Sequence, residues 1–213
     1  MLFETLKTSI MKKIIPFVSA ISLIALFFLV SSFTAGTGDE TSSLQKVIDH
    51  AKWQTTQDVT YDGSWRKIDY PNGDVPANVG VCTDVIIRAY RAIGVDLQKL
   101  VHEDMKSNHS DYQERRRTKV LDRNIDHRRC PNLQTYLDRQ GTKQPITTKG
   151  IDYLPGDIVF WDIAAGHVGM VIDEKVDNTD RFKIVHNIGG GPQKEDFLFA
   201  ASIVGHYRWM PGN

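Results

Sequence analysis

The chain contains little cysteine, with only Cys82 and Cys130 among its 213 residues. Two thiols can form no more than one disulfide, so a framework of several disulfides is excluded. In an oxidising compartment, a single Cys82–Cys130 bridge is the simplest interpretation of the composition alone. The local sequence around Cys82 favours a reactive thiol instead.

The sequence also lacks an excess of either charge, because 26 Lys and Arg residues balance 26 Asp and Glu residues, for a formal net charge of +0. This balance argues against nucleic acid or an anionic membrane surface as a partner. The charge run Glu114–Arg117 is interpreted as a solvated helix face. With 41% hydrophobic and 24% charged residues, the composition is that of a globular protein of one ordinary domain or two very small ones.

A long apolar run occurs near the N-terminus, where Lys12 and Lys13 precede residues 14–30 and mostly small residues follow at 31–36. This order predicts a secretory signal peptide over residues 1–36, in which residues 1–10 are an upstream extension. An uncleaved membrane anchor is the alternative, because the run approaches the length of a membrane span. No cysteine follows the run, which argues against a lipoprotein. We expect a periplasmic or secreted protein without stable membrane insertion after cleavage.

The rest of the chain divides into a helical part and a strand-forming part. Residues 37–43 are polar and predict a linker, and the apolar spacing of residues 44–54 predicts a helix. Residues 82–93 repeat this spacing and end at Gly94, a plausible C-cap. The polar stretch 96–141 is expected to be helical in pieces. After Gly150, four short apolar runs separated by turns predict antiparallel strands, and helices followed by a meander sheet indicate the α+β class.

Cys82 stands where the helix over residues 82–93 is expected to begin. The unpaired backbone N–H groups and the dipole at a helix start favour an anion, and the thiolate is the nucleophilic form of cysteine. The same N–H groups could hold an oxyanion on an attacked carbonyl. Gly80 lets the backbone turn sharply and lets a substrate approach. This context predicts a catalytic cysteine.

A nucleophilic cysteine needs a base, and two of the seven histidines occur in strand contexts. His167 opens one predicted strand and His186 lies near the end of the next, so antiparallel pairing can bring both onto one face. One could be the base and the other could orient it. Each histidine alone is more often a structural residue. Asn187 would point to the face opposite His186 in an ideal strand.

Four motifs follow one another in the chain: VCTD at 81–84, PGDIVFW at 155–161, HVGMVID at 167–173 and IVHN at 184–187. Their types and order resemble the NlpC-type cell-wall cysteine peptidases of the papain-like clan. The longer stretches YPNGDVPANVGVCTDVIIRAYRA, RNIDHRR and HNIGGGPQKEDFLF resemble the bacterial family named domain of unknown function 1287, over about residues 45–210. The chain departs from the clan in VCTD, where Val81 replaces Asp and Thr83-Asp84 replaces Ser-Gly. It also departs in the lengths of the loop 62–81 and the segment 96–150.

The resemblance implies a papain-like, NlpC-type α+β fold, with N-terminal helices and the nucleophile at a helix start, packed on an antiparallel sheet of about four to six strands. It implies one catalytic domain at 44–213 with a helical insertion at about 96–150. By this resemblance Cys82 is the nucleophile, His167 the base and His186 the orienting residue. Tyr61 would line the site near the thiol.

Other residues are candidates for substrate binding. Arg128 and Arg129 could bind a substrate carboxylate, because an arginine fork matches its geometry, although salt bridges would serve structure equally well. Asp84, close to the nucleophile, and Asn187, directly after the second histidine, complete this set.

Three further features have plainer interpretations. Cys130 has no apparent helix-start context and is interpreted as a buried or free thiol. His127 and Cys130 have the spacing of half a zinc site, but the second half is missing, so we expect no metal. The glycines of GGGP at 189–192 are interpreted as a turn rather than a phosphate loop.

These expectations combine into an exported cysteine hydrolase that cleaves an amide bond in peptidoglycan stem peptides, or in a related peptide or amidated substrate, with no metal or cofactor. A catalytically silent cell-wall-binding module on the same fold is the alternative from another class. An acyl or peptidyl transferase would use the same three residues. We expect a monomer.

Overall fold

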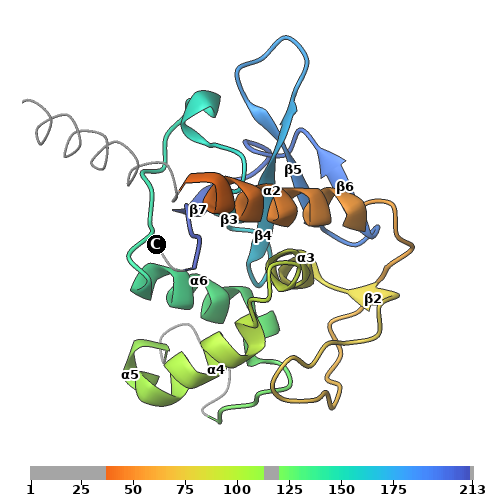
Figure 1. Cartoon of the computed structure of the whole chain (residues 1–213), viewed down its shortest axis with the longest axis vertical. Helices are drawn as coiled ribbons and strands as arrows, with labels where there is room; N and C mark the ends of the chain where they lie inside the picture. The colour runs from red at the N-terminus through yellow and green to blue at the C-terminus, as the bar shows by residue number, and fades with distance from the viewer. Residues whose placement is uncertain (1–36, 113–119, 212–213) are drawn as a thin grey trace, which may run out of the picture. The chain divides into compact units, whose positions relative to one another are not determined.

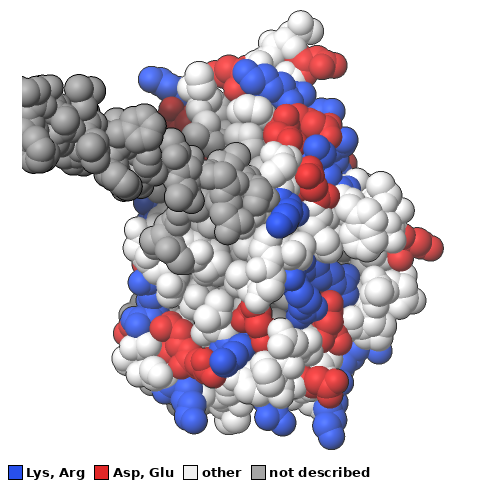
Figure 2. All heavy atoms as spheres, in the orientation of Figure 1, with Lys and Arg blue, Asp and Glu red and all other residues white. Residues whose placement is uncertain are grey.

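The computed structural model describes residues 37–112 and 120–211 (Figure 1). Residues Ser43–Asn213 form one compact unit, and of the other unit, Met1–Ser42, residues 37–42 are described and are helical. The predicted signal peptide over residues 1–36 and the whole charge run Glu114–Arg117 lie outside the described residues. On the face shown in Figure 2, Lys and Arg side chains are interspersed with Asp and Glu side chains. In the part of the chain that is described, no helix is long and apolar enough to span a membrane.

A five-stranded antiparallel sheet forms the centre of the unit, in the strand order β6-β5-β4-β3-β7. The strands are β3 (Ile158–Trp161), β4 (His167–Lys175), β5 (Phe182–Asn187), β6 (Pro192–Glu195) and β7 (Ile203–Tyr207). The expected antiparallel pairing is confirmed, because β3 to β6 pair in chain order and β7 returns to the free side of β3. Strand β6 did not stand out in the sequence because all but its first residue are exposed, so it carries no apolar run.

The described residues contain five α-helices: α2 (Thr37–Gln54), α3 (Cys82–Arg91), α4 (Leu97–Ser107), α5 (His109–Tyr112) and α6 (Cys130–Arg139). Two single 3₁₀ turns, η1 (Asp126–Arg128) and η2 (Gly150–Asp152), join them to the rest. The expectation of helical pieces between 96 and 141 is confirmed. Residues 37–43 differ from the expected linker, because α2 already begins at Thr37; a polar composition does not by itself exclude a helix.

Two apolar clusters sandwich the sheet. On one face, Ile158 and Phe160 of β3 pack with the expected stripes of α2 and α3, and Figure 1 shows both helices beside β4. On the other face, the alternate residues Val159 and Trp161 pack with Leu198 from the loop between β6 and β7. A short parallel pair, β1 (Thr60–Tyr61) and β2 (Val79–Gly80), leads the chain into α3. This arrangement brings the start of α3 to one end of β4 and β5.

Candidate active site

Cys82 is the first residue of α3, as the sequence predicted. The preceding Val81 has an extended backbone, with φ −122° and ψ −176°, so the chain changes from strand to helix at this point. The Asp84 carboxylate accepts the backbone N–H of Val81 at 2.6 Å, which fixes the first turn. The Cys82 side chain is buried but borders a cavity. The nucleophile candidate therefore lies at the positive end of a helix dipole.

His167 and His186 meet on one face of the sheet. Gly169 of β4 pairs with His186 of β5, and His167 lies two residues before Gly169, so both rings project to the same side. His167 Nε2 lies 2.8 Å from His186 Nδ1, which confirms the expected contact between the two rings. The ring of Phe197 covers His186 at a centroid separation of 4.1 Å and helps to bury it.

Glu195 on β6 extends this contact by one residue. Its Oε2 lies 3.1 Å from His186 Nε2. An ionised carboxylate can only accept, so His186 Nε2 carries a proton and, in the neutral ring, Nδ1 must accept. His167 Nε2 then carries the donated proton, and His167 Nδ1 is left as the atom that can take a proton. Sequence reasoning missed Glu195. Once β6 is known to be a strand, Gln193 pairs with His186, and Glu195, two residues further along, faces the same side of the sheet.

The surroundings of His186 lower its pKa and so favour its neutral ring, the form that the hydrogen bond from His167 requires. Burial lowers the pKa of His186, and the positive charge that His167 can carry lowers it further, against the opposing effect of Glu195. His186 therefore favours the neutral ring, which is the form that can accept the N–H of His167. A pair made of a base and an orienting residue would require this state.

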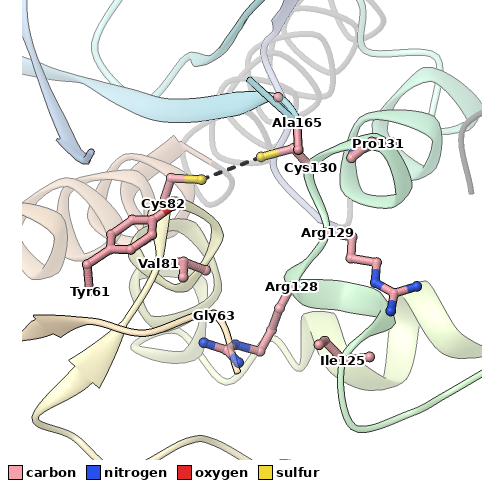
Figure 3. Close-up of a pocket in the computed structure, with 11 residues that line it drawn as sticks. Tyr61, Gly63, Val81, Cys82, Ile125, Arg128, Arg129, Cys130, Pro131 and Ala165 are labelled. Atoms are coloured by element: carbon pink, nitrogen blue, oxygen red, sulfur yellow. Dashed lines mark hydrogen bonds between the residues drawn. The ribbon is translucent and has the colours of Figure 1, made fainter. Parts of the chain in front are cut away.

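A cavity of about 390 Å³ opens in front of Cys82 (Figure 3). It is lined by Tyr61, Gly63, Val81, Cys82, Ile125, Arg128, Arg129, Cys130, Pro131, Ala165 and Gly166. Tyr61 lies beside the thiol, as expected from the resemblance. Burial, together with the nearby charges that Cys82 and Cys130 can carry, raises the pKa of Tyr61 to about 12, so its hydroxyl remains protonated and can donate a hydrogen bond.

Cys130 occupies a position that the sequence interpretation did not anticipate. It is the first residue of α6, so the expectation that it lacks a helix-start context was wrong; Pro131, in the first turn, is the sequence signal that marks this start. Its Sγ lies 3.5 Å from Cys82 Sγ, and both thiols are free and buried. The hydrogen bond from Cys130 and the neighbouring His167 lower the pKa of Cys82 against the effect of burial. The contact with Cys82 and burial raise the pKa of Cys130.

Asp84 and Arg128 pair with each other inside the protein. Arg128 Nε and Nη2 donate to the two oxygens of Asp84 at 2.9 and 2.8 Å, and both side chains are 3% exposed. Arg128 Nη2 also donates to the backbone carbonyl of Asp62 at 3.1 Å. The guanidinium borders the cavity, and its Nε and Nη2 hold η1 to Asp84 of α3 and to the backbone of Asp62. Arg129 also lines the cavity, and its Nη1 lies 3.6 Å from Asp126 Oδ1.

Asn187 lies outside the set of residues that line the cavity. Its side chain points to the face opposite His186, as expected, and its Nδ2 donates to the carbonyl of Gly80 at 3.4 Å. Its Oδ1 accepts the backbone N–H of Gly189 at 3.2 Å. Asn187 therefore holds β2, the strand that leads to Cys82, and also the turn after β5. The positive φ angles of Gly189 and Gly191 agree with the turn expected for GGGP.

His127 is buried in η1. Burial and the adjacent Arg128 lower the pKa of His127 to about 3, so the ring is neutral. Within residues 37–112 and 120–211, no group of three His, Cys, Asp or Glu side chains is placed to hold a metal ion. The buried Asp157 of the PGDIVFW motif accepts hydrogen bonds from the buried His206 and from the partly exposed Arg208, so this motif residue holds β7 to the turn before β3.

Comparison with known proteins places the site in a sequence family. The family model with the description Domain of unknown function (DUF1287) matches residues 48–209. A relative from Escherichia coli (strain K12), described as "Uncharacterized protein YijF", is 46% identical over 167 residues, which are 77% of this chain and 80% of that protein. The family match spans every site residue from Tyr61 to Glu195.

Proposed function

This chain belongs to the family described as Domain of unknown function (DUF1287), and we propose that it is an exported cysteine hydrolase that cleaves an amide bond. The observation that carries the proposal is a row of polar contacts near Cys82, which runs from His167 through His186 to Glu195. His167 Nε2 lies 2.8 Å from His186 Nδ1, and His186 Nε2 lies 3.1 Å from Glu195. This row leaves His167 Nδ1 as the base for a thiol whose pKa is already lowered by its neighbours.

The reaction follows from these positions. The Cys82 thiolate attacks the carbonyl carbon, and the N–H groups at the start of α3 stabilise the oxyanion. His167, protonated by the thiol, gives its proton to the leaving amine, and the thioester forms. A water molecule then loses a proton to His167 and attacks the thioester, which releases the acid and restores the Cys82 thiol. His186, with Glu195 behind it, keeps the His167 ring in the required tautomer.

We assign the site to the papain-like clan and its NlpC-type branch as part of this proposal. Its support is the order of the motifs together with a cysteine on a helix start and two histidines on adjacent strands. The described residues that line the cavity include Arg128 and Arg129 and no Asp or Glu. Arg128 is paired with Asp84, so Arg129, whose side chain is 26% exposed, is the cation that a bound carboxylate can reach. A cavity of about 390 Å³ with this lining suits a short peptide that carries carboxylates. Peptidoglycan stem peptides have this chemistry, and we propose them as the substrate class.

A digestion of peptidoglycan by the reduced protein, analysed by mass spectrometry, tests the proposal. We expect new fragments with a free amine and a free carboxylate from stem peptides, and none from Cys82→Ala or His167→Ala. His50→Gln is a matched control, because His50 lies on α2, outside the row of contacts, and its side chain bonds Gln54. Fragments that form equally with Cys82→Ala would refute the proposal.

A further inference from the structure

Cys82 and Cys130 are separated by 48 positions in the chain, yet they form a close pair at one cavity. Figure 3 shows their sulfur atoms pointing toward each other, 3.5 Å apart. A disulfide bond is about 2.05 Å long, so bond formation requires the sulfurs to approach by about 1.5 Å. The two residues begin α3 and α6, so each sulfur lies at the positive end of a helix.

Polar contacts hold the two helix starts together. Thr83 Oγ1, next to Cys82, donates to the carbonyl of Arg128 at 2.8 Å, and Arg128 lies two positions before Cys130. The buried fork between Arg128 and Asp84 joins the same two segments a second time. Charge-assisted hydrogen bonds are among the strong ones, so these contacts keep the two helix starts, and with them the two thiols, next to each other.

Gly166 provides the space in which Cys130 sits. A Cβ atom at position 166 would lie 2.9 Å from the Cβ of Cys130, and the glycine has φ +102°, which other residues rarely adopt. The turn directly before His167 is thus shaped around Cys130. The scaffold contacts and this space are independent observations, and both place a second thiol against the nucleophile.

We propose that Cys82 and Cys130 form a redox-active pair, a modification site at which a low-molecular-weight disulfide oxidises the two thiols to a Cys82–Cys130 bridge. Cys82 is the attacking thiol and Cys130 is the resolving thiol. The opposite directions of their pKa shifts agree with these roles, because the thiolate at Cys82 is favoured and the proton on Cys130 is retained.

The exchange proceeds in two steps. The Cys82 thiolate attacks one sulfur of R–S–S–R, forms the mixed disulfide Cys82–S–S–R and releases one RS⁻. Cys130 loses its proton to water and attacks the Cys82 sulfur, which forms the bridge and releases the second RS⁻. The two protein thiols lose two electrons and two protons, and R–S–S–R becomes two RSH. A dithiol reductant reverses both steps.

The bridge would occupy the sulfur that the proposed hydrolysis requires, so oxidation would stop turnover and reduction would restore it. This consequence rests on the proposed function, whereas formation of the bridge does not. The two can therefore be tested separately: the bridge by mass, and the hydrolysis by product.

The test equilibrates the purified protein in buffers of increasing ratio of oxidised to reduced glutathione, followed by acid quench, denaturation and alkylation with N-ethylmaleimide. We expect intact mass to show two alkylated thiols in reducing buffer and none in oxidising buffer. A non-reducing peptide map should contain a Cys82–Cys130 linked peptide, and dithiothreitol should restore both thiols. In Cys130→Ser the mixed disulfide cannot be resolved, so Cys82 should accumulate a glutathione adduct.

The proposal is overturned if wild-type protein retains two free thiols, or a stable glutathione adduct on Cys82, in the buffer that modifies Cys130→Ser. If the bridge forms as expected but the reduced protein hydrolyses no stem peptide, the redox pair stands and the proposed function fails. If the bridged protein hydrolyses substrate at the full rate, Cys82 is not the nucleophile.

Discussion

The substitution Asp84→Asn tests how the scaffold places the nucleophile. Asp84 accepts two hydrogen bonds from Arg128 and one from the backbone N–H of Val81. The side chains of Asp84 and Arg128 are each 3% exposed. The amide keeps the shape but loses the charge, so Arg128 becomes a buried cation without its counter-ion. Breaking a buried ion pair in this way costs about 3–5 kcal/mol of folding free energy.

The exposed fork between Arg181 and Asp196 is a matched control, because Arg181 Nε also donates to its aspartate at 2.6 Å but both side chains are in contact with solvent. Surface ion pairs contribute little, so Asp196→Asn should change the free energy of unfolding much less than Asp84→Asn. In the double variant Asp84→Asn with Arg128→Met, no uncompensated charge remains, and most of the lost stability should return.

Urea unfolding followed by tryptophan fluorescence gives the free energy of unfolding for each variant by linear extrapolation. If Asp84→Asn proves too unstable for this, thermal unfolding supplies the comparison, at about 2–4 °C for each kcal/mol in a chain of this size. Equal losses for Asp84→Asn and Asp196→Asn, or a double variant less stable than Asp84→Asn alone, would refute the reasoning.

Other predictions concern the site itself. Steady-state kinetics should show no turnover for Cys82→Ala or His167→Ala, whereas His186→Ala should lose about 10⁴ in kcat rather than about 10⁶, and His186→Asn should retain more because its amide oxygen can accept the same hydrogen bond. The pKa of Cys82 is lowered, chiefly by the hydrogen bond from Cys130. Its rate of alkylation by iodoacetamide should therefore remain high at pH values below the pKa of an ordinary thiol, and fall only as the pH drops through the lowered pKa. In Cys130→Ala the midpoint of this profile should move to higher pH; an unchanged midpoint would contradict the assigned cause. Closing the 48-position loop with a disulfide should stabilise the oxidised protein by about 4 kcal/mol, measured by urea unfolding with and without dithiothreitol; equal stability of the two forms would contradict this prediction.

Local signals predicted much of the fold. The helical spacing of apolar residues identified the buried stripes of α2 and α3, and the order of short apolar runs indicated an antiparallel sheet. These features are predictable because each depends on the period of a single element. Strand β6 is different: its residues are polar and exposed, and it exists because β5 offers it a hydrogen-bonding edge. A pattern within one segment does not contain that information.

The same distinction applies to the candidate site. The positions of Cys82, His167 and His186 followed from a helix start and two strands, and the contact between the histidines is confirmed. Glu195 and Cys130 join the site through tertiary contacts, across β5–β6 and between two helix starts, so neither followed from local spacing. Their roles, and the substrate, remain predictions.

The most direct test of the account is to follow oxygen from water into the product when Cys82 opens an amide bond. Reduced wild-type protein is mixed with purified muropeptides in water enriched in ¹⁸O, and the products are analysed by mass spectrometry at successive times. The account predicts a new stem-peptide carboxylate that carries one ¹⁸O atom, formed by wild-type protein and absent with Cys82→Ala. Formation of the same labelled carboxylate at an equal rate by Cys82→Ala, or no opened amide bond with the fully reduced wild-type protein, would contradict it.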